Sequence, residues 1–443
     1  MVSGSVSSEK PRFRQTEIGL VPEDWEVKKL NELGAPKEVV LTGPFGSLLH
    51  SSDYAEKGVP LLLVNCIEDG RLSGEKIPKV NRRKAEELKR FLLKEGDIVF
   101  SRVGVVGRTL YIDSDKEGWM FSGQTLRIRL NNPRVYNRFV EYYFRSPSAK
   151  NISEKTSLGT TRPSINTSIL ANRIIPLPTL LEQRAITRIL LDLDLKINLN
   201  RTISRALETV ARAIFKRWFI DFEFPNEEGK PYKSNGDSFI ESDMGEIPEG
   251  WATGGLGSIC DITMGQSPPG ETYNETGNGI PFFQGIRDFG FRFPSKRVYC
   301  TAPTRFAREN DVLLSVRAPI GSLNVAEERC AIGRGVAALR LKGKQNGFLY
   351  YLLLTTHSAW NEYEAKGTVF GSATKQDIHD FKVIIPPKDL LDRFGNMVEP
   401  LDKRILLNRK EVRTLSTIRD SLLPRLMAGQ VRVPVPKEIT EES

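Results

Sequence analysis

Apolar residues recur at spacings of three and four along two long segments of the chain. The first ladder runs from Ile186 to Trp218 and the second from Phe394 to Leu426, and eight of the ten positions in each are apolar. This spacing places apolar side chains on one face of an α-helix. Heptads sustained over this length predict two long helices that bury their apolar stripes against each other as a coiled coil.

The two predicted helices differ in their interruptions. No glycine or proline occurs between Leu180 and Trp218, so this segment predicts one continuous helix about 58 Å long. Gly395 and Pro400 fall inside the second ladder. We therefore expect the second helix to be kinked or to begin near Pro400, and to end at Pro424.

Both ladders carry an asparagine at the same place, Asn200 in the first and Asn408 in the second. A polar residue in a coiled-coil seam fixes the register and orientation of the helices at some cost in stability. Each asparagine could instead face solvent beside the seam. The sequence leaves both interpretations open.

The sequence contains one pattern twice. The segment TEIGLVPEDWEVKKL at 16–30 recurs as SDMGEIPEGWATGGL at 242–256. Further pairs follow in the same order: GDIVFSRVGVVG with NDVLLSVRAPIG, SLGTTRPS with AKGTVFGS, and KINLNRTISRAL with RILLNRKEVRTL. The offset falls from 226 residues at the first pair to 208 at the last. This period is too long for a solenoid repeat and indicates a duplicated domain followed by a helix.

Each copy divides into a body and a helical tail. The bodies hold short apolar runs such as VPLLLVN and DVLLSV, broken by glycine, proline and asparagine, which predict strands and loops. We expect an α+β fold: two similar mixed α/β bodies in tandem, separated by two long antiparallel helices that form a coiled coil with pseudo-two-fold symmetry. The expected segments are a flexible N-terminus (1–15), the first body (16–178), the first helix (179–221), a linker (222–241), the second body (242–386), the second helix (387–431) and a flexible C-terminus (432–443).

The composition narrows the class of protein. A hydrophobic content of 39% is too high for a disordered chain, and neither an apolar run of about 18 residues nor a signal-peptide core occurs, so we expect a soluble protein of the cytoplasm. The four cysteines form no CxxC pair and there are only three histidines, which argues against a metal site in this chain.

Several motifs in the duplicated frame resemble those of one known family. GxxPExW opens both halves, IPLPTLLEQRAI leads into the first helix, and KRWFIDFEFPNEEGKPY closes it. Within the bodies, GPFGSLLHSSDY, and GQSPPGETYN followed by GIPFFQGIRDFG, resemble common target recognition domains. Over residues 16–430 the chain resembles the specificity (S) subunit of type I restriction-modification enzymes.

The resemblance implies a division of labour between subunits. Each body would read one half of a bipartite site in double-stranded DNA, the helices would set the spacer, and two methyltransferase (M) subunits and the restriction/translocase (R) subunits would dock on the chain. No catalysis and no cofactor are expected in this chain; S-adenosylmethionine, ATP and Mg are expected only on the partner subunits. In agreement, neither an NPPY-like tetrapeptide nor a GxxxxGK[ST] phosphate loop occurs in the sequence.

Candidate DNA-reading residues come from the glycine-punctuated loops of both bodies, because arginine, asparagine and glutamine side chains read base edges. In the first body they are Ser47, His50, Arg102, Arg108, Thr160, Arg162, Ser164 and Asn166. In the second body they are Gln266, Tyr273, Asn274, Gln284, Arg287, Arg317, Thr368, Ser372 and Lys375. Any one of them could equally be a capping, turn or surface residue. Since the loops differ while the frame matches, we expect unlike half-sites and an asymmetric recognition sequence.

The charge is modest for a DNA-binding chain. The net charge is +9, and residues 16–178 hold 25 basic and 20 acidic residues whereas residues 242–386 hold 15 of each. A protein that grips many phosphates by itself is usually more basic. We therefore expect weak or salt-sensitive DNA binding by the isolated chain, with partner subunits supplying much of the phosphate contact.

Two hypotheses from other classes share some of these features. A structural adaptor that joins two protein-binding bodies would show the same duplication and heptads. A stand-alone Mg-dependent nuclease could use Asp221 with Glu228 and Lys230, because two carboxylates and a lysine can hold the ion and activate water. That trio lies in a hydrophilic linker, which favours a surface role for it.

Overall fold

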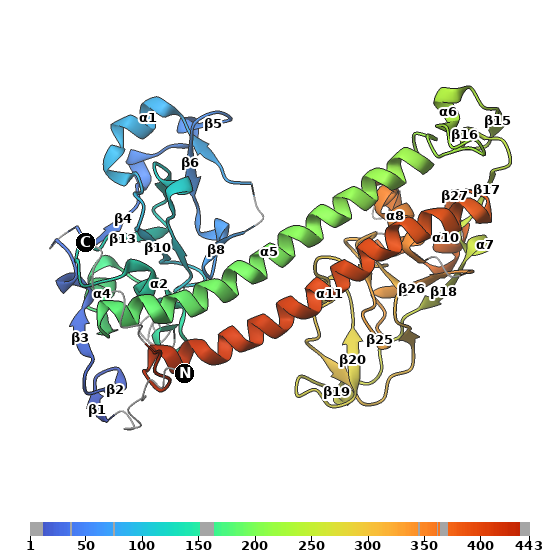
Figure 1. Ribbon diagram of the computed structural model, residues 1–443. Coiled ribbons are helices and arrows are strands. Elements are labelled where there is room, and N and C mark those ends of the chain that lie inside the picture. Colours follow the sequence, from blue (N-terminus) through green and yellow to red (C-terminus); the bar gives the residue numbers. More distant parts are fainter. Residues whose placement is uncertain are drawn as a thin grey trace, which may run out of the picture. The chain divides into compact units, whose positions relative to one another are not determined.

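The computed structural model describes residues 12–35, 38–73, 76–150, 164–343, 346–360, 362–363 and 371–434 (Figure 1). The chain forms two compact units. Unit 1 comprises residues 1–198 and 413–443, and unit 2 comprises residues 199–412. Two long helices, α5 (Leu180–Phe219) and α11 (Lys388–Met427), each contribute residues to both units.

Helix α11 differs from its prediction. It is continuous from Lys388 and passes through Pro400, and it ends three residues after Pro424. The alternative of a start near Pro400 and the expected end at Pro424 were therefore wrong, whereas a kink at Pro400 stays a prediction. A proline inside a helix costs about 3 kcal/mol, but Phe394 and Val398 are buried before Pro400, and Leu426 is buried after Pro424. Burial of this stripe outweighs the lost hydrogen bonds.

Unit 1 contains two small sheets, which lie in residues 12–178, here called head 1. The first sheet has the strand order β11 (Thr109–Tyr111), β10 (Ile98–Ser101), β13 (Thr125–Ile128) and β4 (Val40–Thr42). The second has the order β12 (Met120–Phe121), β6 (Val59–Leu62), β9 (Lys79–Val80) and β5 (Tyr54–Ala55). Two-stranded pairs are β1 (Phe13–Thr16) with β2 (Gly19–Pro22), β3 (Glu26–Lys29) with β14 (Ile174–Leu177), and β7 (Ile67–Glu68) with β8 (Arg71–Leu72). The helices are α1 (Arg82–Glu87), α2 (Asn137–Arg145) and α4 (Thr167–Ala171).

Strand β10 shows why head 1 forms layers. All four of its residues are buried, because alternate side chains enter different cores. Ile98 and Phe100 pack with Phe139 and Phe144 of α2, whereas Val99 packs in the core under the second sheet. The first sheet is thus covered on both faces, by α2 and by the second sheet.

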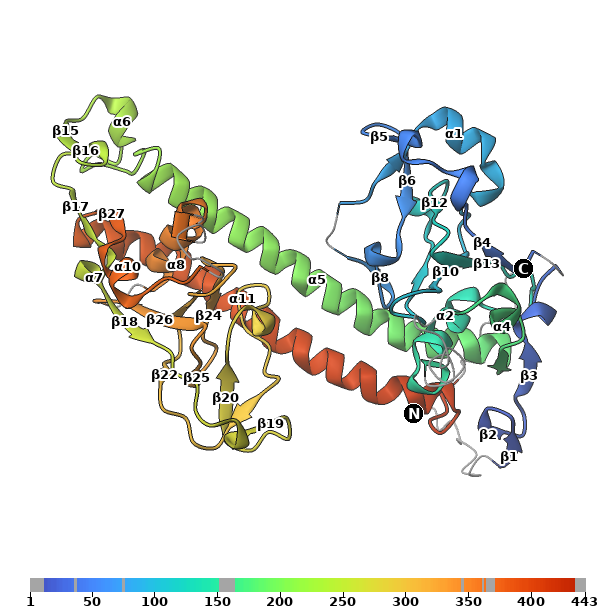
Figure 2. The ribbon, with the colours of Figure 1, turned by 180° about the vertical axis from the view of Figure 1, so that it is seen from behind.

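Unit 2 repeats this architecture in residues 239–386, here called head 2 (Figure 2). One sheet has the order β18 (Cys260–Met264), β26 (Val336–Leu341), β23 (Val312–Ser315) and β24 (Leu323–Val325). The other has the order β19 (Tyr273–Asn274), β21 (Tyr299–Cys300), β20 (Ile280–Phe283), β25 (Cys330–Ile332) and β22 (Phe306–Ala307). The strand pairs are β15 (Phe239–Ser242) with β16 (Gly245–Pro248), and β17 (Ala252–Gly255) with β27 (Lys382–Ile385). The helices of head 2 are α7 (Leu256–Ile259), α8 (Asn346–Thr355) and α10 (Lys375–Asp380), and α6 (Tyr232–Asn235) lies between α5 and head 2.

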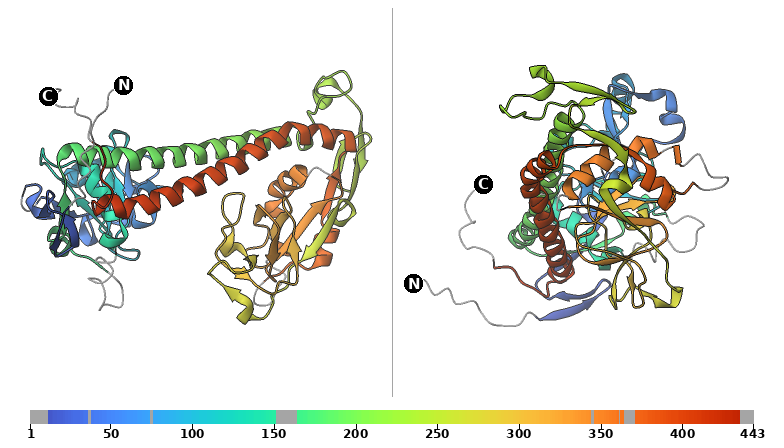
Figure 3. Two further views of the ribbon diagram at one scale, coloured as in Figure 1. Left: turned by 60° about the horizontal axis from the view of Figure 1, so that its bottom comes forward. Right: turned by 90° about the vertical axis from the view of Figure 1, so that its right-hand side faces the viewer.

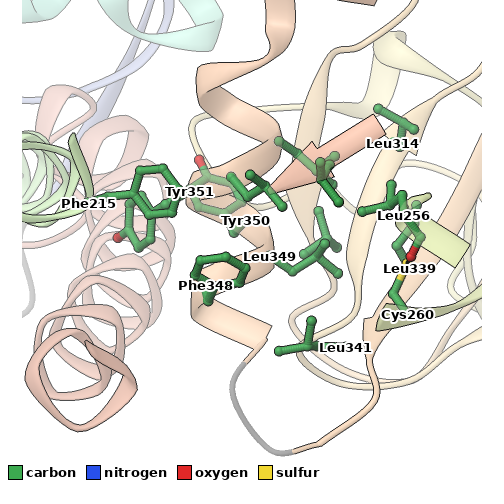
Figure 4. Close-up of a cluster of buried hydrophobic side chains, with 14 of the residues drawn as sticks. Phe215, Leu256, Cys260, Leu314, Leu339, Leu341, Phe348, Leu349, Tyr350 and Tyr351 are labelled. Atoms are coloured by element: carbon green, nitrogen blue, oxygen red, sulfur yellow. Dashed lines mark hydrogen bonds between the residues drawn. The ribbon is translucent and has the colours of Figure 1, made fainter. Parts of the chain in front are cut away.

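The main core of unit 2 joins head 2 to the helices. Phe348, Leu349 and Tyr351 of α8 stand between Leu339 of the sheet and Phe215 of α5 (Figure 4). Since every one of these side chains is buried, head 2 is packed onto the helix pair of its own unit.

The helices α5 and α11 run antiparallel within each unit (Figure 3). In unit 1, Asp194 of α5 pairs with Arg419 near the end of α11. In unit 2, Ala211 and Phe215 of α5 share a core with Phe394 near the start of α11. The expected α+β fold, with two similar bodies in tandem and two long antiparallel helices, is confirmed.

Asn200 and Asn408 both lie buried within unit 2. The Nδ2 group of Asn408 donates to Ser204 Oγ at 3.2 Å and to the backbone carbonyl of Asn200 at 3.5 Å. The solvent-facing alternative was therefore wrong, because both side chains lie in the seam. A role in fixing the register stays a prediction.

Candidate nucleic-acid interface

Loops from separate parts of head 2 meet at one end of its first sheet. The amide of Val316, which follows β23, donates to the carbonyl of Gly335 at 3.0 Å, and the amide of Ala373 donates to that of Val316 at 2.9 Å. The amide of Gln266, which follows β18, donates to the carbonyl of Ile332 at 3.0 Å. These bonds gather the loops that carry five of the predicted residues: Gln266, Gln284, Arg317, Ser372 and Lys375.

The side chains of these five residues are exposed. Arg317 and Ser372 form a β-bridge between two of the loops. Lys375 is the first residue of α10, behind the capping box that Thr374 and Asp377 form. A surface that presents amide, guanidinium and ammonium groups on backbone-braced loops can donate to base edges and to phosphates.

Head 1 brings its loops together by the same bonds. The amide of Arg102 donates to the carbonyl of Gln124 at 3.1 Å, and the amide of Ile165 donates to that of Arg102 at 2.9 Å. Val103 and Ser164 form the β-bridge equivalent to that of Arg317 and Ser372. The two heads thus build the same loop frame and place different residues on it.

A buried serine holds the central loop of each frame. Ser101 Oγ donates to the carbonyl of Val105 at 2.6 Å and accepts from the amide of Arg108 at 2.8 Å. Ser315 Oγ donates to the carbonyl of Pro319 at 2.8 Å and accepts from the amide of Ser322 at 2.9 Å. Such internal bonds fix the loop shape before any ligand arrives.

Several other predicted residues have partners inside the protein. Asn166 caps α4 by accepting from the amide of Ile169, and Asn274 accepts from the amides of Thr276 and Asn278. The hydroxyl of Tyr273 donates to the carbonyl of Pro268 at 2.6 Å, and the guanidinium of Arg108 donates to that of Ile67 at 3.2 Å. These four side chains stabilise turns or loops.

The remaining predicted residues are placed as follows. Ser47 lies in the short helix η2 (Gly46–Leu48), His50 precedes η3 (Ser51–Asp53), and Arg287 lies in η8 (Ile286–Asp288); all three are exposed. Thr160, Arg162 and Thr368 lie outside the described residues.

Two exposed residues on the interface escaped sequence analysis. Gln124 lies in head 1 on the turn between β12 and β13, and Arg334 lies in head 2 on the equivalent turn between β25 and β26. Arg334 stands between two glycines, and a Cβ on Gly335 would lie 2.3 Å from the carbonyl oxygen of Gln284. The motif GRG, aligned with SGQ of the first copy, is the signal that could have found them.

Each head is fixed to its own helix pair by an equivalent tyrosine–aspartate bond. In unit 1, the hydroxyl of Tyr142 donates to Asp194 at 2.9 Å. In unit 2, the hydroxyl of Tyr351 donates to Asp402 at 2.7 Å. Tyr351 lies 209 residues after Tyr142, and Asp402 lies 208 residues after Asp194. Both pairs therefore belong to the duplicated sequence.

The charges around the two aspartates differ. Burial favours a raised pKa for Asp194, but Arg145 and Arg419 outweigh it and hold the pKa of this carboxyl below its usual value. Around Asp402 burial prevails over Arg292, and the pKa of the carboxyl is raised. The aspartate of unit 2 therefore depends on a single arginine, which comes from head 2 rather than from a helix.

Of the three residues of the nuclease hypothesis, Glu228 and Lys230 are exposed on the linker, and Asp221, just before it, is partly exposed. Asp221 accepts from the ammonium of Lys216 at 2.6 Å, and Glu228 pairs with Lys230 at 2.8 Å. Within the described ranges, no group of three His, Cys, Asp or Glu side chains is placed to hold a metal ion. In the same part of the chain, no helix has the length and apolarity needed to cross a membrane.

Comparisons with known proteins agree with this architecture. The family model of the type I restriction modification DNA specificity domain matches the chain twice, over residues 22–209 and 248–415. A chain of Methanocaldococcus jannaschii assigned as the specificity subunit of the type I restriction enzyme MjaX is 31% identical over 431 residues, covering 95% of this chain and 97% of that one. The MjaIX specificity subunit of the same organism is 26% identical over 445 residues, covering 95% and 96%.

A solved structure shares the fold. The S subunit of a type I restriction-modification system from M. genitalium superposes with a TM-score of 0.58 at 16% identity, covering 94% of this chain and 99% of that one. The double family match and the full-length relatives decide the assignment. The chain therefore belongs to the specificity subunits of type I restriction-modification systems, as a non-catalytic, DNA-recognising member with two tandem specificity domains.

Proposed function

We propose that each head reads one half of a split, asymmetric DNA sequence. The observation that carries this proposal is the common loop frame with unlike side chains. Head 1 presents Gln124 and Ser164 on it, whereas head 2 presents Arg334 and Gln284 at neighbouring positions. Arginine pairs best with guanine and glutamine with adenine in the major groove, so two such surfaces select different bases.

The helices α5 and α11 set the gap between the half-sites in this proposal. In the chain α5 follows head 1 and α11 follows head 2, and each is a single helix that contributes residues to both units. A helix adds a fixed rise of about 1.5 Å per residue, so helix length translates into a fixed distance. Asn408 opposes a slip of one helix along the other, because a slip would take its buried Nδ2 group away from Ser204 Oγ and from the backbone carbonyl of Asn200.

Exposed apolar residues on the helices support two equivalent docking surfaces for methyltransferase subunits. Three of them in α5 recur in α11 at an offset of 208 residues. The exposed fractions are 36% and 45% for Ile189 and Met397, 52% and 56% for Leu199 and Leu407, and 49% and 41% for Val210 and Ile418. Apolar side chains exposed at repeated positions mark a contact with a partner, and two copies of the pattern fit two copies of one partner.

The same proposal assigns the chemistry to the partners. S-adenosylmethionine binds to the methyltransferase subunits, and ATP and Mg act with the restriction subunits, which complete the complex on double-stranded DNA. The complex acts in the cytoplasm, where the DNA of the host lies. Because residues 242–386 carry equal numbers of basic and acidic residues, the partners supply much of the phosphate contact.

Changing Leu199 and Leu407 together to lysine tests this dependence on partners. Both side chains are more than half exposed, so the double variant should fold normally. We expect its affinity for the methyltransferase to fall at least about tenfold, since two desolvated charges replace apolar contacts. Co-purification measures the loss of methyltransferase binding. Fluorescence polarisation with duplex DNA measures the accompanying loss of sequence-dependent DNA binding.

The exposed Thr209→Lys variant on α5 is the matched control and should bind the partner normally. Sequence-dependent DNA binding should require the partner at physiological salt. If the wild-type chain retains the methyltransferase but the complex shows no sequence preference, the chain is an adaptor and the proposed function is wrong.

A further inference from the structure

The two heads differ in the space between their sheets. In head 2 a hollow of about 540 Å³ is lined by residues of β18 and β26 on one side and of β22 and the segment before it on the other. Its walls include four arginines, two threonines and two aspartates: Arg305, Arg308, Arg329, Arg340, Thr263, Thr304, Asp261 and Asp311. Hollows of this size accommodate small ligands.

Head 1 fills the same space. Ala338 of β26 pairs with Thr263 and Leu313, and its equivalent Arg127 of β13 pairs with Leu41 and Val99. The long side chain of Arg127 is buried there and donates to the backbone carbonyl of Glu38 at 2.9 Å. The methyl group of Ala338 in head 2 therefore corresponds to the guanidinium of Arg127 in head 1. The hydroxyl of Thr263 corresponds to the side chain of Leu41.

A second substitution opens the other wall. The amide of Lys94 donates to Asp97 in head 1 as the amide of Arg308 donates to Asp311 in head 2, at 2.8 and 2.7 Å. Three residues before these positions stand Phe91, which is buried, and Arg305, which is exposed. The buried ring of Phe91 in head 1 thus corresponds to the exposed guanidinium of Arg305 in head 2.

The arginines of the hollow are available to a ligand. Arg340 pairs with Asp311 at 2.6 Å, as Arg129 pairs with Asp97 in head 1, so this pair belongs to the common frame. Among the residues that the structure describes, Arg305, Arg308 and Arg329 have no carboxylate within 4 Å. Arg329 stacks on the ring of Phe306, 4.3 Å from its centroid, which holds it at the rim.

The hollow lies away from the DNA-reading loops. Those loops leave the sheet at Ser315 and Val336, whereas Asp311 and Arg340 lie at the opposite ends of the same strands. Arg340 lies four residue steps along the strand from Val336, a distance of about 13 Å. The arginines therefore do not belong to the loop frame that presents Arg334 and Gln284.

We propose that this hollow is a binding site for phosphate groups, specific to head 2. Guanidinium groups bind phosphate with paired, charge-assisted hydrogen bonds, and three unpaired arginines around one hollow provide them. The phosphates come either from a free phosphorylated molecule or from the DNA backbone. In the second case they add affinity without adding sequence preference. The site goes beyond the reading of half-sites and does not depend on it.

Calorimetric titration of the full chain with inorganic pyrophosphate, and separately with a short duplex of random sequence, tests the proposal. We expect saturable binding of one of the two probes. Changing Arg305 and Arg308 together to alanine should weaken it at least about tenfold. The exposed Arg83→Ala variant in head 1 is the control and should bind as the wild type does.

A second variant distinguishes loss of the hollow from misfolding of the chain. Changing Arg305 to phenylalanine and Thr263 to leucine copies head 1 and should close the hollow without lowering the melting temperature. Pyrophosphate binding that both variants lose supports a free phosphorylated ligand, and a reduced salt dependence of duplex binding supports the DNA backbone. The proposal is overturned if neither probe binds, if the variants bind both probes normally, or if they lose only the methyltransferase, which would indicate an acidic protein surface instead. The methylated motif should stay unchanged in all cases, which separates this test from that of the proposed function.

Discussion

Replacing Arg292 with methionine is expected to destabilise unit 2 by about 3–5 kcal/mol. Arg292 is 4% exposed, pairs with Asp402 at 2.6 Å and with Glu208 at 3.6 Å, and donates to the hydroxyl of Tyr351 at 2.8 Å. Methionine fills a similar volume but leaves the two carboxylates without a cation. Hydrogen–deuterium exchange should accelerate in β23 and β26 of unit 2 and stay unchanged in β10 and β13 of unit 1.

Two variants sharpen this test. Arg287 is exposed, so Arg287→Met should change stability by less than about 0.5 kcal/mol. Replacing Asp402 with leucine in the Arg292→Met background should restore part of the stability, because an apolar pair replaces a broken ion pair. A cost below about 1 kcal/mol for Arg292→Met would show that the buried network does not hold head 2 on its helices.

Replacing Arg334 with alanine is expected to change one half of the recognised sequence and leave the other half intact. Loss of a bidentate contact to guanine costs about 1–3 kcal/mol, or a factor of about 5 to 150 in the rate at the cognate site. The same change should relax the preference at one base pair. Methylation rates on a panel of duplexes, each with one base pair altered, measure both effects.

Gln124→Ala in head 1 is the matched variant, because Gln124 lies on the equivalent turn. It should alter the other half of the sequence. A uniform loss of rate on every duplex in the panel, with no change of preference, would show that Arg334 contacts a phosphate and not a base.

The helices and the duplication could be predicted from the sequence because both leave periodic signals. A stripe of apolar residues over ten positions, from Ile186 to Trp218, lies entirely within α5, which begins at Leu180 and ends at Phe219. The same rule failed at Pro400, because local propensity says nothing about the packing of Phe394 and Val398 that carries the helix through.

The interface could be predicted only as a set of loops. Glycine-rich segments in both copies pointed to Arg317 and Gln284, which the structure brings together. Which loops meet depends on backbone bonds such as that from Val316 to Gly335, and sequence spacing does not reveal them. For the same reason sequence spacing does not show that the side chain of Asn274, a predicted contact residue, also closes a turn, and it does not single out Arg334.

The hollow of head 2 could not be predicted at all. It arises because Ala338 and Arg305 stand where head 1 has Arg127 and Phe91, and the correspondence between these positions follows from strand register. A loose alignment of the two copies does not show which residues face the same space.

The measurement that tests the central claim most directly is the methylated-base map of a host genome that expresses this chain with its methyltransferase partner. We predict one asymmetric motif with two specific halves and a gap of fixed length. A second map, from a chain with one heptad inserted into both α5 and α11, should show the same two halves with a longer gap. A continuous or palindromic motif, or a gap that the insertion leaves unchanged, would contradict the assignment of the heads as half-site readers and of the helices as the element that spaces them.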